Sequence, residues 1–127
     1  MANDESKKQF DELVQGVADS LLSLIREEVG QRTWRLGYVD VRSPAQDGAR
    51  IDKLRIEMEG GSIEGLHVPM DQRMLFFKIW AIKDKVFSKK WYGITITVYL
   101  DGHHEANYNY DPDCINDRAF YDVDEDE

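Results

Sequence analysis

The sequence predicts an α+β domain in which two helices pack on one face of a four- to five-stranded, mainly antiparallel sheet. Apolar residues recur at three- and four-residue spacing over residues 4–29 and again over residues 70–88, which indicates two amphipathic helices. Residues 91–111 instead alternate apolar and polar side chains on either side of an Asp-Gly pair, which indicates a β-hairpin. The order of elements is then a helix, two or three strands, a helix and two strands.

The register of the hairpin follows from which side chains must share a face. A three-residue loop from Leu100 to Gly102 pairs Tyr99 with His103, whereas a two-residue loop would turn the return strand over. We expect the three-residue loop, with Gly102 in the left-handed conformation of a bulged turn and the hairpin at the centre of the sheet. The inner face then carries Ile94, Ile96, Val98, His104, Ala106 and Tyr108.

The N-terminal half is predicted to form one long helix and two or three strands. The helix covers residues 4–29 and ends at Gly30, because glycine suits the position after a helix. Strands follow at residues 33–42 and 50–59, and a short third strand at residues 62–68 is the addition that distinguishes a five-stranded sheet from a four-stranded one.

The first two strands carry specific expectations. Trp34 and Val39 are an odd number of residues apart, so in a regular strand their side chains would point to opposite faces of the sheet. We therefore expect a bulge at Gly37, where the apolar side chains change from one face to the other. The inward set of the second strand is Leu54, Ile56 and Met58, and its outward set is Lys53, Arg55, Glu57 and Glu59.

The second helix follows Pro69, which suits the start of a helix. Its predicted inner face carries Leu75, Ile79, Ile82 and Val86, flanked by Met74, Phe76, Phe77, Trp80 and Phe87. Its outer face and C-terminal end carry Lys78, Lys83, Lys85, Lys89 and Lys90. We expect these lysines to form a solvated helix face, not a nucleic-acid site.

Length and composition indicate one domain over residues 1–121, with a disordered acidic tail at residues 122–127. We see no run of about 18–20 apolar residues and no signal-peptide layout, so no membrane association is expected. The single cysteine, Cys114, makes a reducing, cytoplasmic setting the natural one.

The net charge of −9 is confined to the C-terminal end of the chain. Residues 1–100 carry 15 acidic and 15 basic side chains, whereas residues 101–127 carry ten acidic side chains and only Arg118 as a base. An acidic field at one end disfavours nucleic acid and favours a basic protein partner.

No catalytic, cofactor or metal site is expected. His103 and His104 are neighbours on a strand, point to opposite faces and do not readily share a metal ion. Asp111 and Asp113 fit the start of a calcium loop, but the following positions lack its oxygen ligand and glycine. Carboxylates around Cys114 disfavour a reactive thiolate.

An acidic, aromatic surface remains as the candidate site. Tyrosine and asparagine supply contact area and adaptable hydrogen bonds, while carboxylates pair with lysine or arginine of a partner. The candidate partner-binding residues are Tyr99, Glu105, Asn107, Asn109, Asp111, Asp113 and Asp117.

The layout and the segment ITITVYLDGHHEANYNYDPD resemble the YezG-type immunity proteins, small cytoplasmic antitoxins of bacterial polymorphic toxin systems. The resemblance implies a protein without enzymatic activity that binds a cognate toxin domain, commonly a nuclease, and blocks its active site or substrate path. Two other readings stay open. One is a regulatory module that docks another basic protein; the other is a small-molecule enzyme using His104, Tyr108 and Tyr110 in a pocket under the helices.

Overall fold

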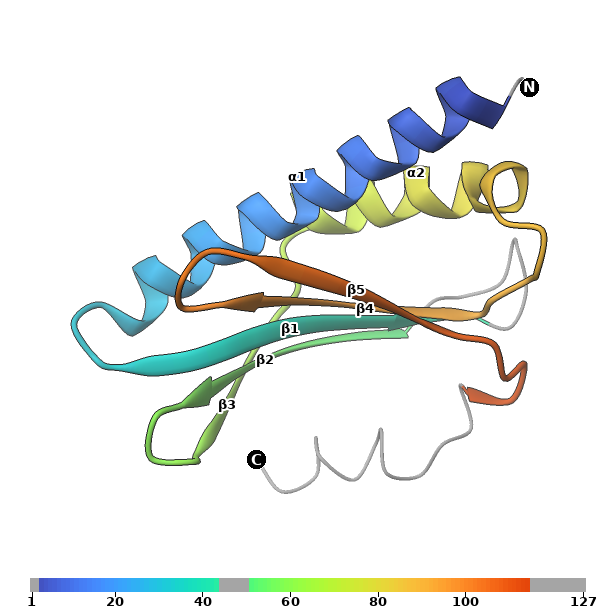
Figure 1. Cartoon of the computed structure of the whole chain (residues 1–127). Coiled ribbons are helices and arrows are strands. Elements are labelled where there is room, and N and C mark those ends of the chain that lie inside the picture. The colour runs from blue at the N-terminus through green and yellow to red at the C-terminus, as the bar shows by residue number, and fades with distance from the viewer. Residues whose placement is uncertain (1–2, 44–50, 115–127) are drawn as a thin grey trace.

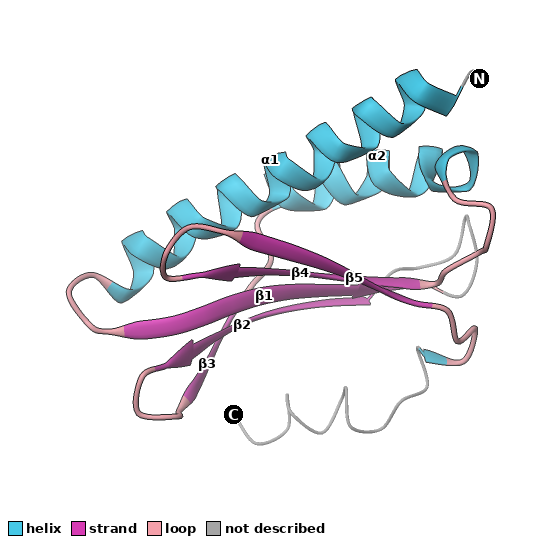
Figure 2. Cartoon of the chain, viewed as in Figure 1, coloured by secondary structure: helices cyan, strands magenta, loops and turns pink. Residues whose placement is uncertain are grey.

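Two helices lie together on one face of a five-stranded antiparallel sheet, as Figures 1 and 2 show. The structure is a computed structural model, and it describes residues 3–43 and 51–114. The elements are α1 (Asn3–Val29), β1 (Trp34–Arg42), β2 (Ile51–Met58), β3 (Ile63–Leu66), α2 (Met70–Val86), β4 (Gly93–Tyr99) and β5 (His104–Asn109). The strand order is β3-β2-β1-β4-β5. This confirms the predicted fold class, whereas the proposed domain limit at residue 121 and the tail at 122–127 lie outside the described residues.

The first helix, α1, ends where the sequence predicts. Gly30 adopts a positive φ of 61°, and its N–H donates a hydrogen bond of 3.2 Å to the carbonyl of Arg26, which closes the last turn. The buried stripe of α1 consists of Phe10, Val14, Val17, Ala18, Leu21, Ile25 and Val29. Within the described ranges, neither helix combines the length and the apolar character that crossing a membrane requires.

The bulge expected at Gly37 lies two residues earlier. The β1–β2 register shifts between Trp34 and Leu36, which lets Trp34 join Val39 on the face that the helices cover. Gly37 has another role, because a Cβ built on it would overlap the Cδ1 atom of Ile25. The glycine therefore marks the closest approach of α1 to the sheet.

The hairpin has the predicted register but a different place in the sheet. Val98 pairs with His104, the N–H of Tyr99 donates to the carbonyl of His103 at 3.0 Å, and Gly102 has a φ of 99°. The three-residue loop is thus confirmed. The expectation of a central hairpin is wrong: β1 is the middle strand, and β5 lies at one edge (Figure 1). The apolar pattern of β4 reflects burial under the helices, which does not require a central position.

The inner face of α2 is rotated from the predicted one. Its buried residues are Gln72, Phe76, Ile79, Trp80 and Lys83. Leu75 is half-buried, and its Cδ1 would lie 3.5 Å from a Cβ at Gly16, so this side of α2 meets α1. Met74 and Phe77 point outward, at 52% and 58% exposure. The large rings of Phe76 and Trp80 decide the rotation, because burying them removes the most apolar area from water.

Lys53 and Arg55 belong to the outward set of β2, as predicted, but they are buried. Both lie on the sheet face opposite the helices, as alternation requires, yet they are only 7% and 5% exposed. In the β1–β2 register they stand beside Asp40 and Tyr38. Alternation determines the face of a side chain, whereas exposure depends on the neighbours that flank its long aliphatic stem.

An aromatic cluster joins α1, the end of α2 and the hairpin. The ring of Trp91 lies 5.1 Å from Tyr108, 5.2 Å from Trp80 and 5.6 Å from Phe87, measured between centroids, and Phe10 packs on Phe87 at 5.1 Å. Burial, followed by the nearby carboxylate of Asp11, raises the pKa of Tyr108. Tyr108 is thus partly buried and packs against the core through its ring.

Candidate functional site

One end of the candidate surface is built around the hairpin turn. The hydroxyl of Tyr99 donates a 2.6 Å hydrogen bond to Glu105 across the β4–β5 ladder, and the Tyr99 ring stacks on His103 at 4.2 Å between centroids. The backbone N–H of His103 donates to the Asp101 carboxylate at 3.0 Å, and the His103 ring also contacts that carboxylate. These contacts form one connected polar group on the face away from the helices.

The same contacts change the acidities of this group. The hydrogen bond from Tyr99 to the Glu105 carboxylate raises the pKa of Tyr99, because losing the proton would leave two adjacent negative charges. Hydrogen bonds from the His103 backbone and ring lower the pKa of Asp101. The lowered pKa favours the charged form of the Asp101 carboxylate.

The other end of the surface lies where the chain leaves β5. The N–H of Asp111 donates to the side-chain oxygen of Asn109 at 2.9 Å, and the N–H of Asp113 donates to the Asp111 carboxylate at 2.9 Å. The N–H of Cys114 closes the turn on the Asp111 carbonyl at 3.1 Å. Asn109 and Asp111 thus shape the turn themselves, whereas the Asp113 carboxylate is exposed.

A buried ion pair on β1 anchors this turn to the sheet. The guanidinium of Arg42 contacts the Asp40 carboxylate at 3.1 Å and donates a 2.8 Å hydrogen bond to the Cys114 carbonyl. The Thr95 hydroxyl donates to the same Asp40 carboxylate at 3.1 Å. Gly93 provides room, because a Cβ there would stand 3.3 Å from Cγ of Arg42. The position of Asp113 therefore depends on the pairing of Arg42 with Asp40.

No protein-family model matches this chain, and a search of curated proteins gives no match. The interpretation of the site therefore depends on its own geometry. Glu105 and Asn107 are exposed and share one face of β5, and Tyr99 joins them through its hydrogen bond to Glu105. Asn109 shares their face but is half-buried in the turn. The remaining predicted residue, Asp117, lies outside the described residues.

The arrangement suits binding to a cationic surface. Across residues 3–43 and 51–114, no three histidine, cysteine or acidic side chains lie close enough together to hold a metal ion. Glu105 lies on β5, whereas Asp113 lies in the turn that follows this strand. Carboxylates on a strand and on the turn that follows it can present several contacts to a cationic partner.

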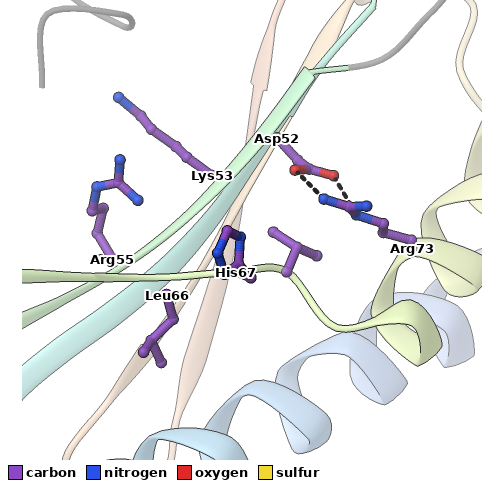
Figure 3. A pocket seen from close by; sticks show the side chains of 8 residues that line it. Asp52, Lys53, Arg55, Leu66, His67 and Arg73 are labelled. Atoms are coloured by element: carbon purple, nitrogen blue, oxygen red, sulfur yellow. Dashed lines mark hydrogen bonds and ion pairs between the residues drawn. The ribbon is translucent and has the colours of Figure 1, made fainter. Parts of the chain in front are cut away.

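A second polar feature, which the sequence interpretation missed, lies where β3 ends and the chain crosses to α2. It is a cavity of about 330 Å³ lined by Asp52, Lys53, Arg55, Gly65, Leu66, His67, Val68 and Arg73. Arg73 of α2 contacts the Asp52 carboxylate at 3.1 Å, while Lys53 and Arg55 project in the other direction (Figure 3). Its charged lining is cationic apart from Asp52, the opposite sign to the hairpin surface.

One sequence signal bears on the buried charges of β1 and β2. Asp40 interrupts the apolar pair Val39 and Val41, and an acidic residue at such a position usually has a buried partner. Lys53 is its cross-strand neighbour in β2. The local sequence does not show that these two charges lie side by side, because that depends on the register between β1 and β2.

Proposed function

We propose that this protein is an immunity protein that binds and neutralises a basic toxin domain of the nuclease type, by covering its active site or substrate path. The proposal rests mainly on two exposed carboxylates, those of Glu105 on β5 and Asp113 in the turn that follows it. Nuclease clefts are basic because they hold phosphate. Carboxylates presented at a defined spacing imitate the charge of that substrate.

Charge distribution supports the same proposal. The first 100 residues are electrically balanced, and the acidic excess starts at Asp101, in the hairpin turn. A dipolar molecule of this kind orients its acidic end toward a basic partner during diffusion, which speeds association in a salt-dependent manner. Inhibition of a toxin inside the producing cell benefits from fast association.

The resemblance to YezG-type immunity proteins, carried by the hairpin sequence, is a further support. In this proposal the protein acts in the cytoplasm through protein contacts alone, without catalysis and without a cofactor. Tyr99 and Asn107 supply the amphipathic contact area beside the carboxylates, and the hydrogen bond from Tyr99 to Glu105 holds them in one arrangement before binding.

Two experiments test the proposal. Co-expression with the toxin encoded beside its gene is expected to restore growth of a sensitive cell. Stopped-flow association with that toxin is then compared for the neutralised variant Glu105→Gln/Asp113→Asn and the control Glu12→Gln/Glu27→Gln. Both double variants change net charge by the same amount, but Glu12 and Glu27 are exposed on α1, in the layer opposite the candidate surface.

The hairpin variant is expected to associate about tenfold more slowly at low salt and to show a weaker salt dependence, while the control stays close to wild type. Glutamine at position 105 still accepts the Tyr99 hydrogen bond, so the change reports charge and not a lost contact. Continued killing on co-expression would contradict the immunity function. Equal rates for the two variants would show that the hairpin carboxylates are not the toxin-binding surface.

A further inference from the structure

The outer edge of β5 is the longest open strand edge in the described part of the chain. β5 has six residues and pairs with β4 on one side only, and Figure 1 shows it along one border of the sheet. The opposite border is β3, which has four residues including Gly65, and its Glu64 is ion-paired with Arg32 at 2.6 Å. The two borders are therefore not equivalent.

The register identifies which backbone groups of β5 face outward. The N–H of Tyr99 bonds to the carbonyl of His103, so this is a hydrogen-bonded pair of the antiparallel ladder. Hydrogen-bonded pairs alternate along such a ladder, so Glu105, Asn107 and Asn109 direct their N–H and C=O groups to β4. The N–H and C=O groups of His104, Ala106 and Tyr108 point to the open edge, and no backbone hydrogen bond between described residues outside the strand ladders reaches them.

Apart from the charge of Glu105, features that normally protect an edge strand are missing from β5 itself. Residues 104–109 contain no lysine, arginine or proline, and the β4–β5 register runs through six pairs without a shift. Open edges of soluble proteins are usually blunted by such residues or by bulges, because unpaired backbone groups recruit other strands. An edge with so few protective features, next to the acidic surface, indicates that β5 pairs with a strand of a binding partner.

We propose that the partner of this protein adds an extended segment to the edge of β5. The added strand would bond to the outward groups of His104, Ala106 and Tyr108, and one row of its side chains would lie beside Glu105 and Asn107. A basic side chain next to Glu105 complements that row, because cross-strand neighbours of opposite charge stabilise each other. The ligand class is thus an extended peptide segment carrying lysine or arginine at alternating positions. This inference rests on the proposed function and specifies the toxin's mode of contact.

Proline substitution at the edge tests the proposal. Ala106→Pro removes an outward N–H and places the ring where an added strand would lie, while the ladder to β4 keeps its hydrogen bonds. Ala106→Ser is the matched control, because it retains the N–H. Each variant is titrated by calorimetry with the toxin encoded beside its gene. We expect at least about tenfold weaker binding for the proline variant and wild-type affinity for the serine variant.

A measurement on the wild-type protein keeps the test independent of how well the proline variant folds. Amide hydrogen exchange is followed by NMR in the free protein and in the complex with the same toxin. The amides of His104, Ala106 and Tyr108 are expected to become protected only in the complex, whereas those of Glu105 and Asn107 are protected in both states. Unchanged exchange at the three outward amides, or wild-type affinity of a folded Ala106→Pro variant, would overturn the edge proposal and leave the immunity function standing. Absence of wild-type binding would overturn both.

Discussion

The ammonium group of Lys83 donates a 2.7 Å hydrogen bond to the backbone carbonyl of Trp91 and stands 4.8 Å from the centre of the Trp91 ring. Its side chain is 4% exposed, and the carboxylate of Asp84 lies 3.3 Å away. The contact joins the last turn of α2 to the start of the hairpin. A lysine expected on a solvated face is therefore buried and ties α2 to the start of the hairpin.

Replacing Lys83 with methionine is expected to destabilise the fold by about 1–3 kcal/mol, because the buried Trp91 carbonyl loses its charged donor while the apolar stem is retained. Urea unfolding followed by tryptophan fluorescence measures the change. Lys78→Met is the control, since Lys78 is exposed on the same helix and its replacement should stay within about 0.5 kcal/mol of wild type. Similar unfolding midpoints for the two variants would contradict a structural role for Lys83.

Gly37→Ala is expected to cost about 1–3 kcal/mol, because the new methyl group would overlap Cδ1 of Ile25 and crowd the Arg55 carbonyl at 3.3 Å. Gly60→Ala is the control, since a Cβ at Gly60 meets nothing within 4 Å and its φ is not in the left-handed region. Thermal unfolding by circular dichroism compares the two.

The same clash can be relieved from the other side. Ile25→Val removes Cδ1, so the double variant Gly37→Ala/Ile25→Val is expected to be more stable than the sum of the single changes predicts. A double-mutant cycle gives the coupling between the two positions. Additive effects would mean that α1 does not press on β1 at Gly37.

Burial raises the pKa of the Cys114 thiol, and the nearby Arg42 opposes that shift only in part. The folded chain then holds this proton to a higher pH than the unfolded chain does. The contribution of Cys114 to stability is therefore complete below its ordinary pKa of 9.0 and declines as the pH rises above it. Iodoacetamide at pH 8 should alkylate the folded protein at least about tenfold more slowly than the urea-unfolded chain, by mass spectrometry. Equal rates would place the thiol in solvent.

Local sequence patterns predicted the elements and the hairpin well. The alternation of Ile94, Ile96 and Val98 and the position of Gly102 were sufficient for the three-residue loop, because turn geometry and face-sharing are local constraints. Most of the candidate surface followed from them. Glu105 and Asn107 share the face that alternation assigns, and Tyr99 lies beside Glu105 across the ladder.

Other parts of the site depend on contacts between distant segments. Arg42 and Cys114 are 72 positions apart, and their hydrogen bond, which holds the turn carrying Asp113, has no signature in either local sequence. The basic cavity likewise needs β2, the end of β3 and α2 to meet.

By itself, the sequence determined two helices, four or five strands, the hairpin register and an acidic excess beginning at Asp101, because each depends on residue types at short spacing. Only the tertiary structure decided that β5 is an edge strand of the sheet and that α2 buries Lys83. It also decided that the side chain of Ile25 fills the space in which a Cβ atom at Gly37 would lie. These outcomes depend on strand order and on which large side chains fill the core. Such choices are settled by close packing between segments far apart in the chain, which no local pattern records.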